Sequence, residues 1–301
     1  MFWWLILLIA FGALVSFKYA RPDGRVLEGH PYRRMMPLLM PTRQGSTAMA
    51  ESFVPVEKLE AYLESMPEGQ RPTLTHVVVA ALAETLHLHP SLNRFEAGGR
   101  LYQRYGVQVV MSLKKDLGDR GSKVAVVKQG IRQGTTPSEL REILGREFSR
   151  ERSGEASYVD REMDVLLRLP HALLWLGVKA MKVLHHLHLL PGSFIERDPL
   201  FASAFVANLG SFKMRDAYHH LYEWGTISVF LVLGRIEERI LSVDGEPKVI
   251  RGLPIRWTLD ERVDDGMTAD HALREFEAIL QDPEKMWGNK ILEIEGESIE
   301  S

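Results

Sequence analysis

The chain has 301 residues, of which 45% are hydrophobic and 26% are charged, as is usual for a globular protein. This length suits one domain of roughly 250 residues or two smaller domains. The formal net charge of -3 gives no electrostatic reason to expect nucleic-acid binding. The absence of cysteine excludes disulfides, thiolate metal sites and cysteine nucleophiles.

The first twenty residues contain an unbroken run of apolar and small side chains from Phe2 to Phe17. As a helix this run would span about 24 Å, and its immediate neighbours would bring it close to the ~30 Å of a hydrocarbon core. Trp3 and Trp4 suit an interfacial anchor, and the basic residues all follow the run. We therefore expect residues 1–20 to form an uncleaved single-pass transmembrane anchor, with the N-terminus outside and the main domain cytoplasmic. A cleaved signal peptide and a core helix are the alternatives.

The remaining chain divides by composition into three parts. Residues 21–34 are polar and contain proline and glycine, which predicts a juxtamembrane linker. Residues 35–285 form the main domain. Residues 286–301 carry four glutamates, which predicts a solvated acidic tail.

Several elements of the main domain follow from its periodicity. Apolar spacing predicts a helix at 57–64 and a largely buried helix from about Leu74 to Leu88, which Pro90 ends. Strands are expected at 106–113 and 123–128. Helices and strands alternate without a doubly wound nucleotide-binding fingerprint, which indicates a mixed α/β or α+β domain.

Two later segments carry more local signals. Thr136, Pro137 and Glu139 have the pattern of an N-cap, a first helical residue and a capping-box partner. Residues 166–190 are unusually apolar, and we expect a helix packed on its own domain or on a neighbouring subunit. An amphipathic helix on a membrane surface is the alternative.

The segment from Asp260 to Gly266 reads Asp-Glu-Arg-Val-Asp-Asp-Gly, between a strand-like and a helix-like run. It resembles the signature Asp-His-Arg-x-x-Asp-Gly of dihydrolipoyl acyltransferases, the core subunits of 2-oxoacid dehydrogenase complexes, and of their chloramphenicol acetyltransferase relatives. Asp260, Arg262, Asp265 and Gly266 match this signature. Glu261 stands where the family has its catalytic histidine.

Other segments resemble the same family in the same order along roughly residues 30–285. They are Pro90-Ser-Leu-Asn, Phe205 to Gly210, and Phe230 to Gly234. The resemblance implies a two-layer α/β chloramphenicol acetyltransferase-like domain, a mixed sheet with helices. It also implies a homotrimer whose active-site channels lie between subunits, and coenzyme A or acyl-CoA as ligand, with no covalently bound cofactor. Because only the anchor and linker precede the domain, we do not expect the core of an ordinary dehydrogenase complex.

The resemblance also assigns roles to individual residues. Glu261 stands at the general base, Asp265 at the buttress and Ala207 at the oxyanion-stabilising hydroxyl, with Asn208 and Gly266 completing the channel. A carboxylate with an ordinary pKa near 4.3 removes a thiol proton at a cost of ~6 kcal/mol, against ~2.7 kcal/mol for histidine. We therefore expect a catalytically degenerate protein acting as a scaffold or ligand-binding protein. The alternative is an active acyl-CoA-dependent acyltransferase that uses Glu261 in a raised-pKa pocket or a nearby histidine such as His220.

The histidines have simpler interpretations. His219 and His220 suit a surface or trimer-contact pair, and His220 reaching the channel as a base is the alternative. His185, His186 and His188 suit a satisfied or solvent-facing cluster, and a metal site is the alternative. We expect no metal.

Overall fold

A seven-stranded mixed sheet forms the centre of the protein. The computed structural model describes residues 21–28, 30–114, 124–152 and 168–288, together with Trp3, Trp4, Ile6 and Leu7. The strand order is β2-β10-β8-β7-β5-β6, and β9 pairs with the N-terminal part of β10. Strand β7 is parallel to β5 and β8, and the other neighbours are antiparallel. The strands are β2 (Thr47–Pro55), β5 (Val107–Lys114), β6 (Val124–Ile131), β7 (Ala204–Asn208), β8 (Val229–Leu233), β9 (Glu237–Val243) and β10 (Glu246–Asp260).

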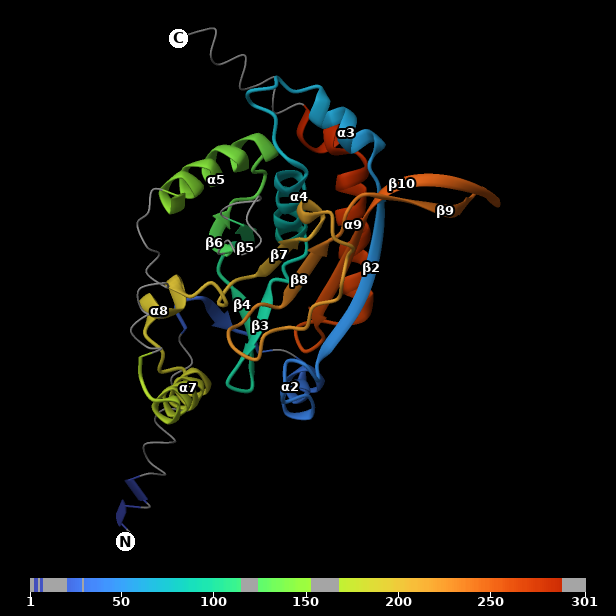
Figure 1. The fold of residues 1–301 in the computed structure, drawn as a ribbon. Helices are drawn as coiled ribbons and strands as arrows, with labels where there is room; N and C mark the ends of the chain where they lie inside the picture. Colours follow the sequence, from blue (N-terminus) through green and yellow to red (C-terminus); the bar gives the residue numbers. More distant parts are fainter. Residues whose placement is uncertain are drawn as a thin grey trace, which may run out of the picture.

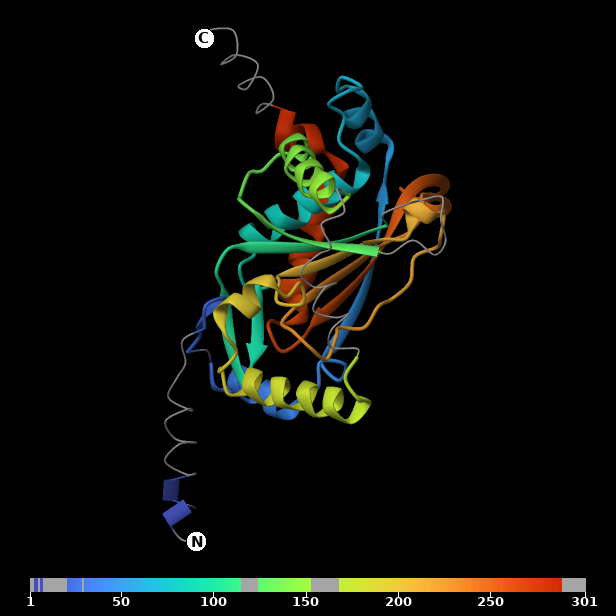
Figure 2. The ribbon, with the colours of Figure 1, turned by 60° about the vertical axis from the view of Figure 1, so that its left-hand side comes forward.

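Helices cover one face of this sheet (Figures 1 and 2). They are α3 (Glu57–Glu64), α4 (Leu74–Leu88), α5 (Pro137–Arg152) and α9 (Gly266–Gln281). Helix α4 is buried at every residue from Val77 to Leu86, as its apolar sequence predicts. Trp257 of β10 packs edge-on against Phe276 of α9, with ring centroids 4.8 Å apart. This contact joins the sheet to the helix layer. The two-layer α/β architecture is confirmed.

The predicted helix start at Thr136 is also confirmed. The Glu139 carboxylate accepts hydrogen bonds from the Thr136 backbone N–H (2.7 Å) and hydroxyl (3.1 Å). The Glu139 backbone N–H donates to the Thr136 hydroxyl at 3.2 Å. This reciprocal capping box satisfies backbone donors that the first turn of α5 leaves without intrahelical partners.

A smaller sheet lies at one end of the molecule, in the order β1-β4-β3. Its strands are β1 (Gly24–Val26), β3 (Arg94–Ala97) and β4 (Arg100–Arg104). Helices α2 (Pro31–Leu39) and α7 (His171–His186) lie at the same end in both views (Figures 1 and 2). The short helix α8 (Gly192–Arg197) follows α7. Residues 21–34, expected as a linker, thus contain a strand and the first turn of a helix.

Helix α7 differs from the other long helices because it has no buried residue. Leu173, Trp175, Leu176, Val178 and Val183 are all more than half exposed. Met181 and Leu184 are the apolar α7 residues that pack against the small buried cluster formed by Leu190, Ile195 and Phe201. Apolar composition predicts burial, but the chain described here supplies no surface for this face of α7.

The expectation of a transmembrane helix is corrected. No helix within the described residues is long and apolar enough to cross a membrane. Of the segment 1–20, Trp3, Trp4, Ile6 and Leu7 are described, and the rest lies outside the described residues. The expected single-pass topology, the outside N-terminus and the cytoplasmic main domain depended on this helix and are withdrawn with it.

Candidate functional site

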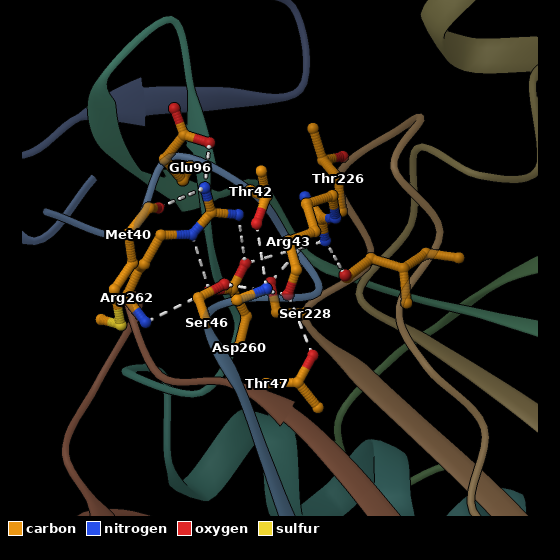
Figure 3. Close-up of polar contacts among 12 residues, drawn as sticks. Met40, Thr42, Arg43, Ser46, Thr47, Glu96, Thr226, Ser228, Asp260 and Arg262 are labelled. Carbon is orange, nitrogen blue, oxygen red and sulfur yellow. Dashed lines mark hydrogen bonds and ion pairs between the residues drawn. The ribbon is translucent and has the colours of Figure 1, made fainter. Parts of the chain in front are cut away.

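The loop between β10 and α9 is anchored by a buried ion pair. The Arg262 guanidinium donates from Nε to Asp260 Oδ1 at 2.9 Å and from Nη2 to Oδ2 at 2.8 Å, and both residues are 1% exposed. Arg262 Nη1 donates to Glu96 Oε2 at 2.9 Å (Figure 3). One guanidinium thus joins the end of β10 to the small sheet through charge-assisted hydrogen bonds.

Two further residues complete this polar network (Figure 3). Ser46 Oγ donates to Asp260 Oδ1 at 3.1 Å, and Arg43 Nη2 lies 3.8 Å from Asp260 Oδ2. Burial alone would raise the pKa of Asp260, but hydrogen bonds from Arg262 and the charges of both arginines outweigh burial and lower that pKa. Asp260 is therefore an ionised anchor for the loop and not a proton donor.

Glu261 is held by its backbone while its side chain is exposed. Its N–H donates to the Ser46 carbonyl at 2.8 Å, and its carbonyl accepts from Arg33 Nη1 at 3.3 Å. No hydrogen bond or ion pair of its carboxylate is found among the described residues. Within one copy, Glu261 therefore presents an exposed carboxylate on a fixed backbone.

Asp265 serves the helix that follows it. Its Oδ1 accepts from the Thr268 N–H at 2.9 Å and the Thr268 hydroxyl at 3.0 Å, so it is the N-cap of α9. These bonds lower the pKa of Asp265. Its Oδ2 lies 3.1 Å from Arg33 Nη2, and its side chain is 55% exposed. Gly266 is the first residue of α9 and has open space where a Cβ would lie.

The second part of the predicted site lies at the C-terminal end of β7. Asn208 Nδ2 donates to Thr75 Oγ1 at 2.7 Å, and its Oδ1 accepts from the Ser211 N–H at 3.0 Å. A Cβ on Gly210 would overlap the Gly234 carbonyl oxygen, which explains why glycine ends the Asn-Leu-Gly segment. Ala207 precedes Asn208, is half-buried and offers no hydroxyl, but Thr75 places one beside Asn208.

These two parts lie at opposite ends of the sheet. Leu259 pairs with Val229 at the start of β8, whereas Asn208 pairs with Leu233 at its end. Four steps along β8 and two beyond Leu259, at ~3.3 Å each, place Glu261 on the order of 20 Å from Asn208. The structure therefore brings Glu261, Asp265 and Gly266 together on one loop, and Ala207 and Asn208 together elsewhere.

His220 joins neither group. It is exposed, in the segment 213–228 that crosses the sheet face opposite the helices (Figure 2). The ring of His219 stacks on Phe230 at 4.2 Å and on His220 at 5.0 Å. Glu223, later in the segment, accepts from the backbone N–H groups of Arg43 (3.3 Å) and Gln44 (3.0 Å).

In the other histidine cluster, His185 and His188 are packed against the domain, whereas His186 is exposed as predicted. His188 Nε2 lies 3.3 Å from the Tyr102 hydroxyl, and the His185 ring packs edge-on against Phe201 at 5.3 Å. Burial, with a smaller contribution from Arg21, lowers the pKa of His185 to about 3 and that of His188 to about 4. Among the described residues, no group of three or more histidine, aspartate or glutamate side chains is placed to hold a metal ion.

Sequence reasoning missed the residues that hold the loop. Arg33, Arg43, Ser46 and Glu96 contact it from distant parts of the chain. Their polar character gave a weak signal, because charged and hydroxyl residues occur all along the sequence. Their burial gave none, because it depends on the tertiary fold.

The sequence matches no protein-family model and no curated protein. Solved structures are similar. Dihydrolipoamide acetyltransferase from Azotobacter vinelandii, studied for the role of a serine, a histidine and an asparagine in its catalytic mechanism, has a TM-score of 0.56. It is 14% identical over 87% of this chain and 94% of its own. The cubic core of a pyruvate dehydrogenase multienzyme complex has a TM-score of 0.55 and 15% identity over 87% and 94% of the two chains.

Chloramphenicol acetyltransferase is similar as well, with a TM-score of 0.53 and 12% identity over 86% of this chain and 98% of its own. These likenesses extend over nearly the whole of each solved chain. At such identities they establish the fold. The chain has the fold of dihydrolipoamide acetyltransferase catalytic cores and of chloramphenicol acetyltransferase.

Proposed function

We propose that this protein is a homotrimer of the CoA-dependent acyltransferase fold that retains a channel for coenzyme A or acyl-CoA between its subunits and has lost efficient acyl transfer. The observation that carries the proposal is the contrast at the loop after β10. Its anchor, Asp260 with Arg262, is complete and buried, whereas Glu261 has an exposed carboxylate where the family resemblance places a histidine.

The separation of the two site halves supports a channel shared between copies. Glu261 and Asn208 are on the order of 20 Å apart in one copy, too far to act on one thioester. A neighbouring copy that places its Asn208 end against this Glu261 end would complete the site. A trimer of such copies would have three equivalent channels.

The β9–β10 hairpin supports association of copies. Residues 246–250 of β10 pair with β9 on one edge, and among the described residues the pairing on the other edge ends where the Val56 N–H donates to the Arg251 carbonyl. Ile240 and Val249 face each other in register and are 73% and 64% exposed. A two-stranded ribbon alone is marginally stable in water, so a second copy that covers this arm would stabilise it.

The vacant roles support impaired chemistry. The catalytic histidine and asparagine named for the Azotobacter enzyme are four residues apart, as are Glu261 and Asp265. Asp265 is committed to capping α9 and to Arg33, and Ala207 has no hydroxyl. Loss of a general base costs ~10²–10⁴ in rate, and loss of an oxyanion donor costs about 10²–10³.

Calorimetric titration of the full-length protein with coenzyme A and acetyl-CoA tests the proposal, alongside a transfer assay that follows free thiol. We expect saturable binding in the micromolar range with transfer near the uncatalysed rate. Absence of binding by a folded oligomer would refute a retained channel. Transfer at rates typical of enzymes, lost on Glu261→Gln, would support the alternative of an active acyltransferase with Glu261 as its base.

A further inference from the structure

Three exposed cations surround the Asn-Leu-Gly segment at the end of β7. They are Lys213, Arg215 and Arg235. Among the described residues, none of the three has a side-chain hydrogen bond or ion pair. The chain as a whole carries a net charge of -3, so a local group of uncompensated cations requires an explanation.

Backbone hydrogen bonds fix these residues next to one another. The Lys213 N–H donates to the Gly210 carbonyl at 2.9 Å, after the 3-10 turn η1 (Gly210–Phe212). The Met214 N–H donates to the Leu209 carbonyl at 3.2 Å, and the Arg235 N–H donates to the Met214 carbonyl at 3.0 Å. The three cations therefore project from a connected piece of backbone that begins one residue after Asn208.

The carboxylates of this region are already paired. Asp216 bonds to Arg256 Nε and is 8% exposed at its side chain. Glu237 Oε1 accepts from Arg239 Nε at 2.8 Å, and Glu51 pairs with Arg256. Glu238 lies farther along β9, close to Arg251. Arg256 neutralises only one of Asp216 and Glu51, so one negative charge remains against the three cations, and the field around Asn208 is positive.

We infer that Lys213, Arg215 and Arg235 form a binding site for the phosphate groups of a ligand whose thioester end reaches Asn208. Guanidinium groups bind phosphate oxygens in a two-bond geometry, and a lysine ammonium adds a point charge. Two sources share this chemistry: free coenzyme A, and a phosphopantetheine arm carried by a protein. The inference rests on the proposed function in one respect, the placement of the thioester at Asn208.

Binding of fragments to the full-length protein separates the parts of this inference. Adenosine 3′,5′-bisphosphate carries phosphates without the thiol arm, pantetheine carries the thiol arm without phosphates, and 4′-phosphopantetheine carries the one phosphate common to both sources. We expect salt-sensitive binding of the bisphosphate. The variant Lys213→Ala/Arg215→Ala/Arg235→Ala should bind coenzyme A about tenfold more weakly, with pantetheine binding unchanged.

The matched control is Lys179→Ala/Lys182→Ala/Lys285→Ala, which removes three exposed cations outside both halves of the site, on α7 and after α9. It has the same net charge as the test variant and should bind coenzyme A as the wild type does. Equal weakening in both variants would mean a general charge effect and would overturn the site. Unchanged binding of coenzyme A by the test variant would also overturn it.

The same titrations distinguish this site from the proposed function. If the test variant loses bisphosphate binding, and the wild type binds coenzyme A no more tightly than the bisphosphate, the phosphate site is supported and the thioester channel is refuted. If the protein binds pantetheine, and the test variant binds coenzyme A as tightly as the wild type does, the channel is supported and the phosphate site is refuted. Equal affinities for 4′-phosphopantetheine and coenzyme A would identify the carrier-bound arm as the source, and a preference for coenzyme A would identify the free cofactor.

Discussion

The Arg262 guanidinium makes two hydrogen bonds to the Asp260 carboxylate and a third to Glu96, in a site almost closed to solvent. It thereby joins the last residue of β10 to β3 of the small sheet. The backbone of Glu261 lies between the two members of this pair, so the geometry of the candidate site depends on it.

Replacing Arg262 with methionine should destabilise the protein by about 3–5 kcal/mol, because Glu96 loses its ion-pair partner and Asp260 keeps only the more distant Arg43 as a charged partner. The midpoint of urea unfolding measures this loss. Arg274→Met is the control, since its pair with Asp270 is exposed on both sides, and it should cost less than about 1 kcal/mol. Similar losses in the two variants would contradict a structural role for the buried pair.

Placing a histidine at position 261 tests the proposed loss of the general base. We expect Glu261→His to raise the rate of acetyl transfer from acetyl-CoA by at least about 10²-fold, and addition of Ala207→Ser to raise it further. Glu68→His, in an exposed loop, is the control for a histidine placed elsewhere. If the restored variants bind acetyl-CoA but remain as slow as the wild type, base loss does not explain the impairment.

Gly210 has a steric reason to be glycine. Gly210→Ala should destabilise the protein by roughly 1–3 kcal/mol, because the new methyl group would overlap the Gly234 carbonyl. Gly145→Ala is the opposite case, in the middle of α5 with open space around its Cβ position, and should stabilise by about 0.5–1 kcal/mol. Thermal unfolding of both variants tests this contrast. Equal shifts of the two unfolding midpoints would contradict the steric role of Gly210.

Acid should destabilise the packing of α7 and α8. His185 and His188 are neutral in the folded protein because burial lowers the pKa of His185 to about 3 and that of His188 to about 4. The unfolded chain takes up protons on both below about pH 6.5, so the stability of the fold falls progressively as the pH drops from about 6.5 to about 4 for His188 and to about 3 for His185.

Arg21, Asp23, Arg43, Arg100 and His186 are the charged and titratable groups that influence these histidines. The variant His185→Gln/His188→Gln should retain about 2 kcal/mol more of its neutral-pH stability at pH 4 than the wild type does, after allowance for partial exposure. Urea unfolding from pH 7 to pH 4 measures this difference. Parallel pH profiles for variant and wild type would exclude the two imidazoles as the cause.

Local sequence signals predicted the elements whose structure depends on local chemistry. Helix α4 extends from Leu74 to Leu88 as its periodicity indicates, and Thr136 and Glu139 form the capping box expected from their spacing. The segment 21–34 was harder, because proline and glycine favour turns whether or not a neighbouring strand is available. β1 forms there through pairing with β4, some eighty residues away.

The relative placement of the site residues could not be predicted from the sequence, because it depends on long-range geometry. Placing Glu261 and Asn208 requires the sheet order and the register of three strands, neither of which is written locally. Arg33 contacts Glu261 across 228 positions of the chain. The exposed apolar face of α7 reverses the usual relation between composition and burial, and the periodicity of the segment does not tell which surface would cover this face.

A crosslinking measurement tests most directly whether one site is shared by two copies of the chain. The chain has no cysteine, so Glu261→Cys and Asn208→Cys can be introduced singly and treated as a mixture with a short bismaleimide reagent. We expect the mixed oligomer to give covalent dimers that join the two variants, and Asn208→Cys mixed with Glu68→Cys to give none. A stable monomer, or an oligomer in which the first mixture forms no crosslink, would contradict a shared site.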